Sequence, residues 1–220
     1  MSLTIVDFNN FWSPSGGGVR RYHLEKMNFY RYETDAVYVF VMPDSRTYTE
    51  QLTDSLIIEH VKAFKFPGKW EYRMLWKSSQ IAPILKRHKP DIIEVGSPYI
   101  LPTVVRKNAK KIVPRAKLLG FWHADFPITY VERPIAEKFG KKLGKLASQV
   151  AFAYARYEFK GFTGIQVSAE ETRLRLKRKG LPAHHQVPLG CDISMFSPTK
   201  RDEKLVSLLK QGDKDRPIIF

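Results

Sequence analysis

Residues 3–32 read LTIVDFNNFWSPSGGGVRRYHLEKMNFYRY, and this stretch decides the fold class. It opens on a short apolar run, residues 3–8, which predicts a buried β-strand. A glycine-rich turn follows, and residues 19–32 then have the amphipathic pattern of a helix. A strand, a glycine-rich turn and a helix in this order are typical of the first unit of a parallel sheet that is covered on both faces.

The same alternation continues along the chain. Further strands are predicted at residues 36–42, 56–61, 91–95, 117–122, 164–168 and 186–189. Helices are predicted at residues 71–88, 101–108, 133–156, 169–179 and 202–210, and residues 46–54 are interpreted as a surface loop. Repeated strand–helix–strand units predict an α/β fold with a doubly wound, Rossmann-like parallel sheet.

The composition of the 220 residues limits the class of protein. Apolar residues make up 43% and charged residues 27%, which excludes a disordered, collagen-like or disulfide-stapled chain. The longest apolar run, residues 36–42, is too short to span a bilayer. The start, MSLTIVDF, lacks the features of a secretory signal, and the single Cys191 fits a reducing compartment. We therefore expect a cytoplasmic protein.

The chain is strongly basic, with 37 Lys and Arg against 22 Asp and Glu and a net charge of +15. A charge of this size favours anionic partners such as nucleotide phosphates, anionic lipid or nucleic acid. The basic runs lack the interleaved aromatic residues of a nucleic-acid site, so no nucleic acid is expected as a partner.

The glycine-rich turn SPSGGG, residues 13–18, is the first candidate site. Gly16, Gly17 and Gly18 would let backbone N–H groups approach a ligand, and the start of the following helix favours an anionic group there. The pattern is neither G-x-G-x-x-G nor a P-loop. The alternative is a plain turn between a strand and a helix.

Polar residues at other strand ends form the second candidate. His123 and Asp125 lie in FWHADFP, directly after a predicted strand, while Asn9 and Ser97 end two others. Open α/β sheets bind ligands at the carboxyl ends of their strands. The alternative for His123 is a structural histidine, and a metal site would need a third ligand that the sequence does not reveal.

Residues 133–150 form the third candidate, a basic amphipathic helix. Ile135, Phe139, Leu143, Leu146 and Val150 share one arc of a helical wheel, and Lys138, Lys141, Lys142 and Lys145 lie on the arc beside it. Such a helix can lie at an anionic membrane surface. The alternative is a core-packing helix whose basic face is solvated.

The ordered set SPSGGGVRRYHLEKM, PDIIEVGSPYILP, FWHADFP and VPLGCDISMFSP resembles the N-terminal domain of GT-B glycosyltransferases of family 4. The greatest similarity is to the branch of GDP-mannose-dependent α-mannosyltransferases and diglycosyl-lipid synthases. The resemblance implies a retaining hexosyl transfer from a GDP- or UDP-linked nucleotide-sugar to a lipid or saccharide acceptor, with no essential metal. It implies that Gly16, Gly17 and Gly18 face the donor and that His123 is the catalytic residue that contacts the donor sugar near the reacting carbon, and Asp125 matches a motif position. Asn9 and Ser97, which end strands at the same rim, are with Asp125 the candidates for the acceptor site or the rim.

The end of the chain carries its own expectation. We interpret residues 1–198 as the acceptor-side domain, residues 199–217 as a helix and linker, and residues 218–220 as the start of a truncated second domain. The alternative is a C-terminal strand that simply ends. Because the donor-binding basic pair and the E-x7-E element of the family belong to the second domain, the chain alone is expected to be inactive.

Two other classes of function remain open at this point. One is a non-catalytic basic module that docks on an anionic membrane surface or on nucleic acid. The other is a nicotinamide-dependent oxidoreductase domain, which the lack of G-x-G-x-x-G disfavours. For the enzyme, we expect a location that is peripheral on the inner face of the membrane.

Overall fold

The computed structural model describes residues 2–12, 17–65, 72–190, 193–213 and 215–218. The chain divides into two compact units, Met1–Pro188 and Leu189–Phe220. The division falls at Pro188, ten residues before the domain end that is predicted from the sequence, residue 198. Residues 219 and 220, in the expected start of a second domain, lie outside the described part.

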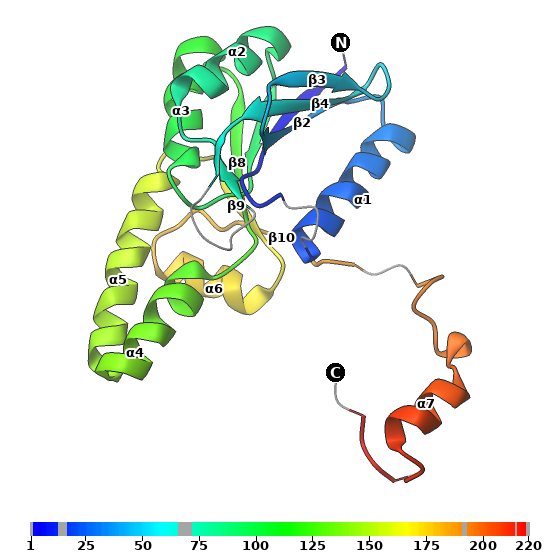
Figure 1. Cartoon of the computed structure of the whole chain (residues 1–220). Coiled ribbons are helices and arrows are strands. Elements are labelled where there is room, and N and C mark those ends of the chain that lie inside the picture. Colours follow the sequence, from blue (N-terminus) through cyan, green and yellow to red (C-terminus); the bar gives the residue numbers. More distant parts are fainter. Residues whose placement is uncertain (1, 13–16, 66–71, 191–192, 214, 219–220) are drawn as a thin grey trace. The chain divides into compact units, whose positions relative to one another are not determined.

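The first unit is built on an eight-stranded sheet (Figure 1) with the order β10-β9-β8-β7-β1-β2-β4-β3. Its strands are β1 (Thr4–Phe8), β2 (Val37–Asp44), β3 (Tyr48–Gln51), β4 (Leu56–Lys62), β7 (Ile92–Val95), β8 (Lys117–Trp122), β9 (Gly164–Val167) and β10 (His185–Gln186). All neighbouring strands are parallel except β3, which pairs antiparallel with β4. A separate small hairpin joins β5 (Phe64–Lys65) to β6 (Arg73–Met74).

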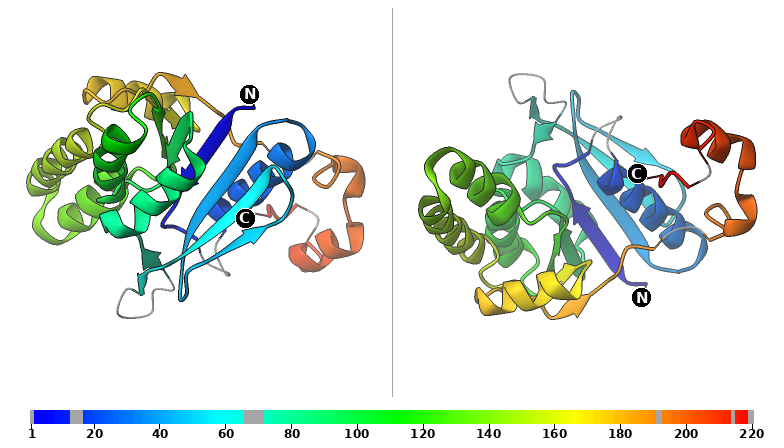
Figure 2. Two further views of the ribbon diagram at one scale, coloured as in Figure 1. Left: turned by 90° about the horizontal axis from the view of Figure 1, so that it is seen from above. Right: turned by 90° about the horizontal axis from the view of Figure 1, so that it is seen from below.

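Helices cover both faces of this sheet, and Figure 2 shows α1 on one face and α2 and α3 on the other. The helices of the first unit are α1 (Gly18–Tyr32), α2 (Ser78–His88), α3 (Leu101–Ile112), the π-helix η1 (Pro127–Glu132), α4 (Arg133–Phe139), α5 (Lys141–Glu158) and α6 (Glu170–Arg178). The predicted doubly wound α/β class is therefore confirmed.

The strand order contains a switch point between β1 and β7. From β1 the chain proceeds to β2 and β4 in one direction, and from β7 it proceeds to β8, β9 and β10 in the other. In such sheets the crevice outside the carboxyl ends of the strands at the switch point is the usual place for a ligand. Here that place is bordered by the residues that follow β1 and β7.

The two faces of the sheet are packed differently. The face under α2, α3 and α5 forms one large apolar cluster, to which β1 contributes Val6 and Phe8 and β7 contributes Ile93 and Val95. The face under α1 has a much smaller apolar cluster, whose buried members are Ile5, Met27, Tyr38, Phe40 and Leu56. The buried charged groups of β1 and β7 lie on this second face.

Four predicted elements were wrong. Of the predicted strand 186–189 only Gln186 belongs to a strand, since β10 ends there. Residues 46–54 are not only a loop, because β3 pairs with β4 there. The predicted helix 71–88 begins only at Ser78, since residues 73–74 belong to β6. The predicted helix 133–156 is broken at Gly140, whose φ of 92° is a conformation that glycine adopts without strain.

The second unit contains the 3₁₀-helix η2 (Pro198–Lys200) and α7 (Glu203–Lys210). The carboxylate of Asp202 begins α7 by accepting hydrogen bonds from the N–H groups of Lys204 and Leu205, at 2.9 and 3.1 Å. Among the described residues of the whole chain, no helix has the length and apolar character needed to cross a membrane.

Candidate functional site

The start of α1 lies directly after the glycine-rich turn. Gly17 is the N-cap of α1, and a Cβ placed on Gly17 or Gly18 would meet no described atom within 4 Å. Their space is therefore open to a ligand. Arg20 lies in the first turn of α1, which contains no acidic residue, so this helix end is electropositive. Gly16, the third predicted glycine, lies outside the described residues.

A chain of buried polar groups begins at Asn9, at the end of β1. The Asn9 side-chain oxygen accepts a hydrogen bond from the Phe11 N–H at 2.7 Å, so its amide nitrogen is free to donate to Nε2 of His23 on α1. Nδ1 of His23 then faces the carboxylate of Asp7, at 3.5 Å. Burial lowers the pKa of His23 to about 4, although Asp7 opposes the shift, so this imidazole is neutral at pH 7.

His123 lies beside this chain, directly after β8. Its ring packs on Phe121, with 4.1 Å between centroids, and lies 5.8 Å from the ring of His23. Its Nε2 atom is buried and has no hydrogen-bond partner among the described residues. Burial lowers the pKa of His123 to about 3, and His23 lowers it further. A neutral imidazole with an unsatisfied nitrogen can accept a hydrogen bond, or donate one in its other tautomer.

Gly96 makes the close approach of these groups possible. A Cβ on Gly96 would lie 2.7 Å from Nδ2 of Asn9 and 3.0 Å from Nε2 of His123. Any larger residue at this position would displace one of the two side chains. The carboxyl ends of β1, β7 and β8 are thus brought together around one glycine.

A buried cluster of charged side chains lies next to these residues, between α1 and strands β1 and β7. Asp7 and Glu94 are direct partners on β1 and β7, and Nζ of Lys26 contacts both carboxylates, at 2.8 Å from Asp7. Burial alone would raise the pKa of Asp7, but Lys26, His23 and the Tyr38 hydroxyl together outweigh it, and the pKa falls to about 2. Burial raises the pKa of Glu94. Burial disfavours the charged form of Lys26, yet the two carboxylates hold its pKa well above the usual range.

The other predicted rim residues are held in place by protein contacts. Ser97 is fully buried, and its hydroxyl accepts a hydrogen bond from the Tyr99 N–H at 3.4 Å. Asp125 forms an ion pair with Arg175 of α6 at 2.9 Å, and burial raises the pKa of Asp125 although Arg175 opposes the shift. Asn9 and Ser97 thus lie near His123 at the switch point, whereas Asp125 is directed toward α6.

The four predicted membrane lysines are all exposed on α4 and α5: Lys138, Lys141, Lys142 and Lys145. The apolar arc beside them is exposed as well, with 61% of Phe139, 46% of Leu143, 57% of Leu146 and 65% of Val150 accessible. Ile135, the remaining member of the arc, is half-buried. The alternative of a core-packing helix with a solvated basic face therefore holds for α5 as a helix, although this apolar arc is not the face that packs on the core. The core face of α5 consists of small residues, Phe152 and the buried Glu158, whose carboxylate accepts a hydrogen bond from the Thr103 N–H.

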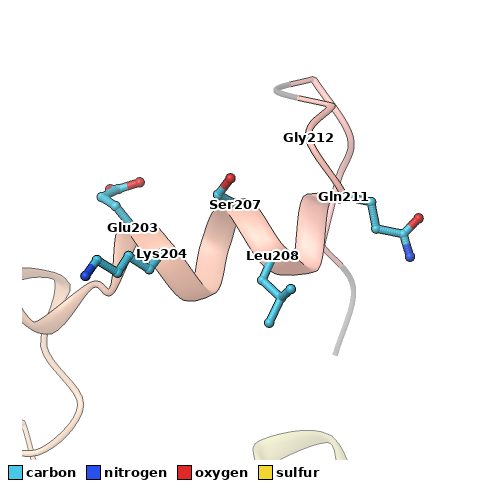
Figure 3. Close-up of a pocket in the computed structure, with 6 residues that line it drawn as sticks. All are labelled: Glu203, Lys204, Ser207, Leu208, Gln211 and Gly212. Carbon is cyan, nitrogen blue, oxygen red and sulfur yellow. The ribbon is translucent and has the colours of Figure 1, made fainter.

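A hollow in the second unit is unrelated to these residues. It runs beside α7 and is lined by Glu203, Lys204, Ser207, Leu208, Gln211 and Gly212 (Figure 3). None of the predicted site residues lines it.

Four residues of this site were not predicted from the sequence: His23, Lys26, Glu94 and Gly96. A signal for the charge cluster was present, because Asp7 and Glu94 are acidic residues inside otherwise apolar strands, where an unpaired charge is costly. His23 and Lys26 had no such signal, since polar residues on an amphipathic helix are usually solvated.

Comparisons with known proteins agree with the fold and with the family that the sequence resembles. Residues 16–195 match Glycosyltransferase Family 4, and no curated protein matches the chain. Among solved structures, it is similar to sucrose-phosphate synthase from Thermosynechococcus elongatus, at 8% identity over 94% of this chain and 98% of that one (TM-score 0.51). A glycosyltransferase from Rickettsia africae ESF-5 is 17% identical over 99% of this chain and 51% of that one (TM-score 0.51).

A structure of trehalose-6-phosphate from E. coli bound with UDP-2-fluoro glucose is also similar, at 13% identity over 94% of this chain and 54% of that one (TM-score 0.53). At these identities the structural likenesses show the fold alone. The chain spans about half the length of the Rickettsia and E. coli structures.

Proposed function

Since this chain belongs to glycosyltransferase family 4, we propose that it is the acceptor-side half of a retaining glycosyltransferase. In this proposal the enzyme moves a hexose from a nucleotide-sugar to a lipid or saccharide acceptor. The observation that carries it is the meeting of three strand ends at the switch point, where a neutral His123 lies with an unsatisfied nitrogen. The GDP-mannose-dependent branch and a reaction without an essential metal are part of the same proposal.

The residues have separate roles in this reaction. The backbone N–H groups of residues 16–18 and the start of α1 stabilise the negative charge that develops on the leaving diphosphate. His123 forms a hydrogen bond with the donor sugar. Because its pKa is lowered to about 3, His123 acts at neutral pH through hydrogen bonding and not as a cation. Asn9 and His23 are positioning residues, because they act by holding this corner of the sheet.

The donor site is incomplete without a second domain. The chain spans about half of two similar structures, and we propose that the other half holds most of the nucleotide. Residues 1–220 alone are then expected to turn over no nucleotide-sugar and to bind it weakly. Turnover by the purified chain, or a submicromolar dissociation constant in calorimetry, contradicts this division of labour.

The main test uses a full-length protein that contains this chain. GDP- and UDP-sugars are supplied with lipid and saccharide acceptors, and transfer is measured for the wild type and for His123→Ala. Loss of one hydrogen bond to the transition state lowers turnover by roughly 100-fold or more. His88→Ala is the matched control, since His88 lies at the end of α2 and its Nε2 atom contacts the Glu59 carboxylate of β4 at 2.6 Å, away from the carboxyl ends of the strands.

Two results of that test contradict the proposal. Activity of His123→Ala within a few-fold of the wild type would mean that the histidine is structural. Absence of transfer with every donor, together with binding to anionic vesicles, would favour the non-catalytic membrane module.

We also propose that the α4–α5 surface holds the enzyme on an anionic membrane, at the inner face of the cell membrane. The exposed apolar side chains and the four lysines beside them provide both the hydrophobic and the electrostatic contact. Each lysine near such a surface contributes on the order of 1 kcal/mol. Co-sedimentation with anionic vesicles should weaken with salt and when all four lysines become Glu. Equal binding to neutral vesicles would contradict it.

A further inference from the structure

An apolar groove lies next to the predicted rim, between η1 and α5. It has a volume of about 590 Å³, which is in the range of small-molecule sites. Its lining consists of Tyr99, Phe126, Tyr130, Val131, Ala147, Val150, Ala151 and Tyr154. None of these residues contributes a carboxylate, an amide or a charge, so the polar side-chain groups of the lining are limited to three tyrosine hydroxyls. The hydroxyl of Tyr154 already accepts a hydrogen bond from the Ile100 N–H.

The shape of the groove follows from small residues on α5. A Cβ on Gly144 would lie 2.7 Å from the Cβ of Ala136 and 2.8 Å from the Glu132 carbonyl oxygen, so α5 packs tightly on α4 and η1 at this point. About one turn further along α5, Ala147 and then Ala151 line the groove. Their short side chains leave the space that larger residues would fill.

An unusual backbone borders the groove on two sides. The six-residue η1 is a π-helix, a form that is rare and frequent at functional sites. Ile100, next to Tyr99, has a φ of 55°, which is strained for a β-branched residue. Its N–H donates a hydrogen bond to the Tyr154 hydroxyl at 3.0 Å, so the strained turn is fixed to α5.

A line of aromatic rings connects the groove to the site. Phe11, two residues after Asn9, lies 6.0 Å from the ring of Tyr99, which is itself two residues after Ser97. Tyr99 lies 5.2 Å from Phe126, and Phe126 lies 6.4 Å from Tyr154. The apolar wall thus runs without interruption from the ends of β1 and β7 to α5.

The outer end of the groove joins the exposed surface of α5. Val150 lines the groove and is 65% exposed. Leu146 and Lys142 precede it at successive four-residue steps on the same helix, and residues so spaced are neighbours on a helix surface. An elongated ligand in the groove would therefore have apolar contacts inside it and would meet the positive charge of Lys142 at its outer end.

We propose that this groove binds the hydrocarbon chain of an anionic lipid and presents that lipid to the site as the acceptor. This inference rests on the proposed function and specifies its acceptor class. The aromatic wall and the alanines hold the chain by apolar contact, and Lys142 and Lys145 complement the negative charge of the lipid. The enzyme would thus take its acceptor from the same membrane surface on which α4 and α5 lie.

The test measures binding of dodecyl phosphate to the 220-residue chain by calorimetry, below the micelle concentration and at low salt. One-to-one binding is expected, and butyl phosphate should bind at least about ten-fold more weakly because a short chain buries little apolar area. Equal binding of the two phosphates, or no binding of dodecyl phosphate, overturns the proposal. Because no donor or transfer is involved, failure of this test is distinguishable from failure of the glycosyltransferase proposal.

Variants locate the binding in the groove. Ala147→Trp fills it and should weaken binding of dodecyl phosphate at least about ten-fold. Ala153→Trp adds the same side chain at an exposed position of α5 outside the groove, and it should leave affinity within about two-fold. Equal effects of the two substitutions would overturn the assignment.

Two further measurements keep the result interpretable. Val150→Gln changes an exposed residue with little risk to folding, and it should also weaken the binding. Sedimentation of the free chain tests whether the groove instead joins two copies. A concentration-dependent dimer that Ala147→Trp abolishes would overturn the lipid proposal.

Discussion

The two faces of the central sheet differ in what they bury. Under α2, α3 and α5 the strands at the switch point present an apolar surface, with Val6, Phe8 and Val95 fully buried. The buried carboxylate of Glu59 on this side belongs to β4, away from the switch point, and contacts α2. Under α1 the switch-point strands present Asp7 and Glu94 to Lys26. The apolar face supplies most of the hydrophobic stabilisation, whereas the polar face holds costly charges directly beneath the proposed site. This difference is the one expected if the polar face serves the proposed site.

The largest expected effect comes from removing the central cation of the polar face. Lys26→Met leaves Asp7 and Glu94 buried without a partner charge, which should cost about 3–5 kcal/mol of unfolding free energy in urea denaturation. On the apolar face, Ile93→Val should cost only about 0.5–1.5 kcal/mol. Adding Glu94→Gln to Lys26→Met should recover part of the loss. Equal costs on the two faces would remove the distinction between them.

The next effect concerns the glycine around which the strand ends meet. Gly96→Ala forces its Cβ against Asn9 and His123, and we expect a loss of about 1–3 kcal/mol in stability. The substitution should also lower the turnover of the full-length enzyme, because the imidazole is displaced. Unchanged stability and turnover would show that the close approach has no role.

A smaller effect should appear as pH dependence. The pKa of His23 is lowered to about 4, whereas that of an unfolded histidine is near 6.5. The unfolded chain therefore binds the proton first, so the contribution of neutral His23 is complete above pH 6.5 and is lost as the pH falls toward 4. Between pH 7 and pH 5 this contribution should fall by about 1–2 kcal/mol.

The control for that prediction is His23→Gln, with each protein compared with its own stability at pH 7. The variant should lose less stability than the wild type on acidification. Identical losses would mean that His23 is not buried in the neutral form.

The smallest effect on stability is expected at the start of α1. A side chain on Gly17 meets no described atom within 4 Å, so Gly17→Val should change the unfolding free energy by no more than about 0.5 kcal/mol. In the full-length enzyme the same variant should lower turnover, because the valine obstructs the approach of the donor to the backbone. Normal kinetics would show that the turn is only a connector.

Much of the sheet could be predicted from the sequence because its strands are covered on both faces and therefore read as apolar runs. The bounds of β8 were predicted to the residue. β3 was missed because it is an exposed edge strand without apolar alternation. The break at Gly140 was missed because the apolar period of the helix continues across it, so that only the glycine itself marks the end of α4.

The site could be predicted only in part, for a related reason. Asn9, Ser97 and His123 follow predicted strands, so the topology alone brought them to one edge of the sheet. His23 and Lys26 face the sheet because of how α1 is rotated about its own axis, and the sequence does not specify that rotation. As polar residues on a helix, they would ordinarily be expected on its solvated face. Asp125 follows a strand as His123 does, but its ion pair with Arg175 depends on the position of α6.

The most direct measurement of the central claim is the protonation of His23 and His123 in the folded chain. Spectra of ¹⁵N-histidine-labelled protein from pH 8 to pH 5 should show both imidazoles neutral throughout, each in one tautomer, with the urea-unfolded chain as the reference titration. Midpoints near that of the unfolded chain for both residues would contradict the account, because the polar face would then hold no neutral imidazole ready for the donor sugar.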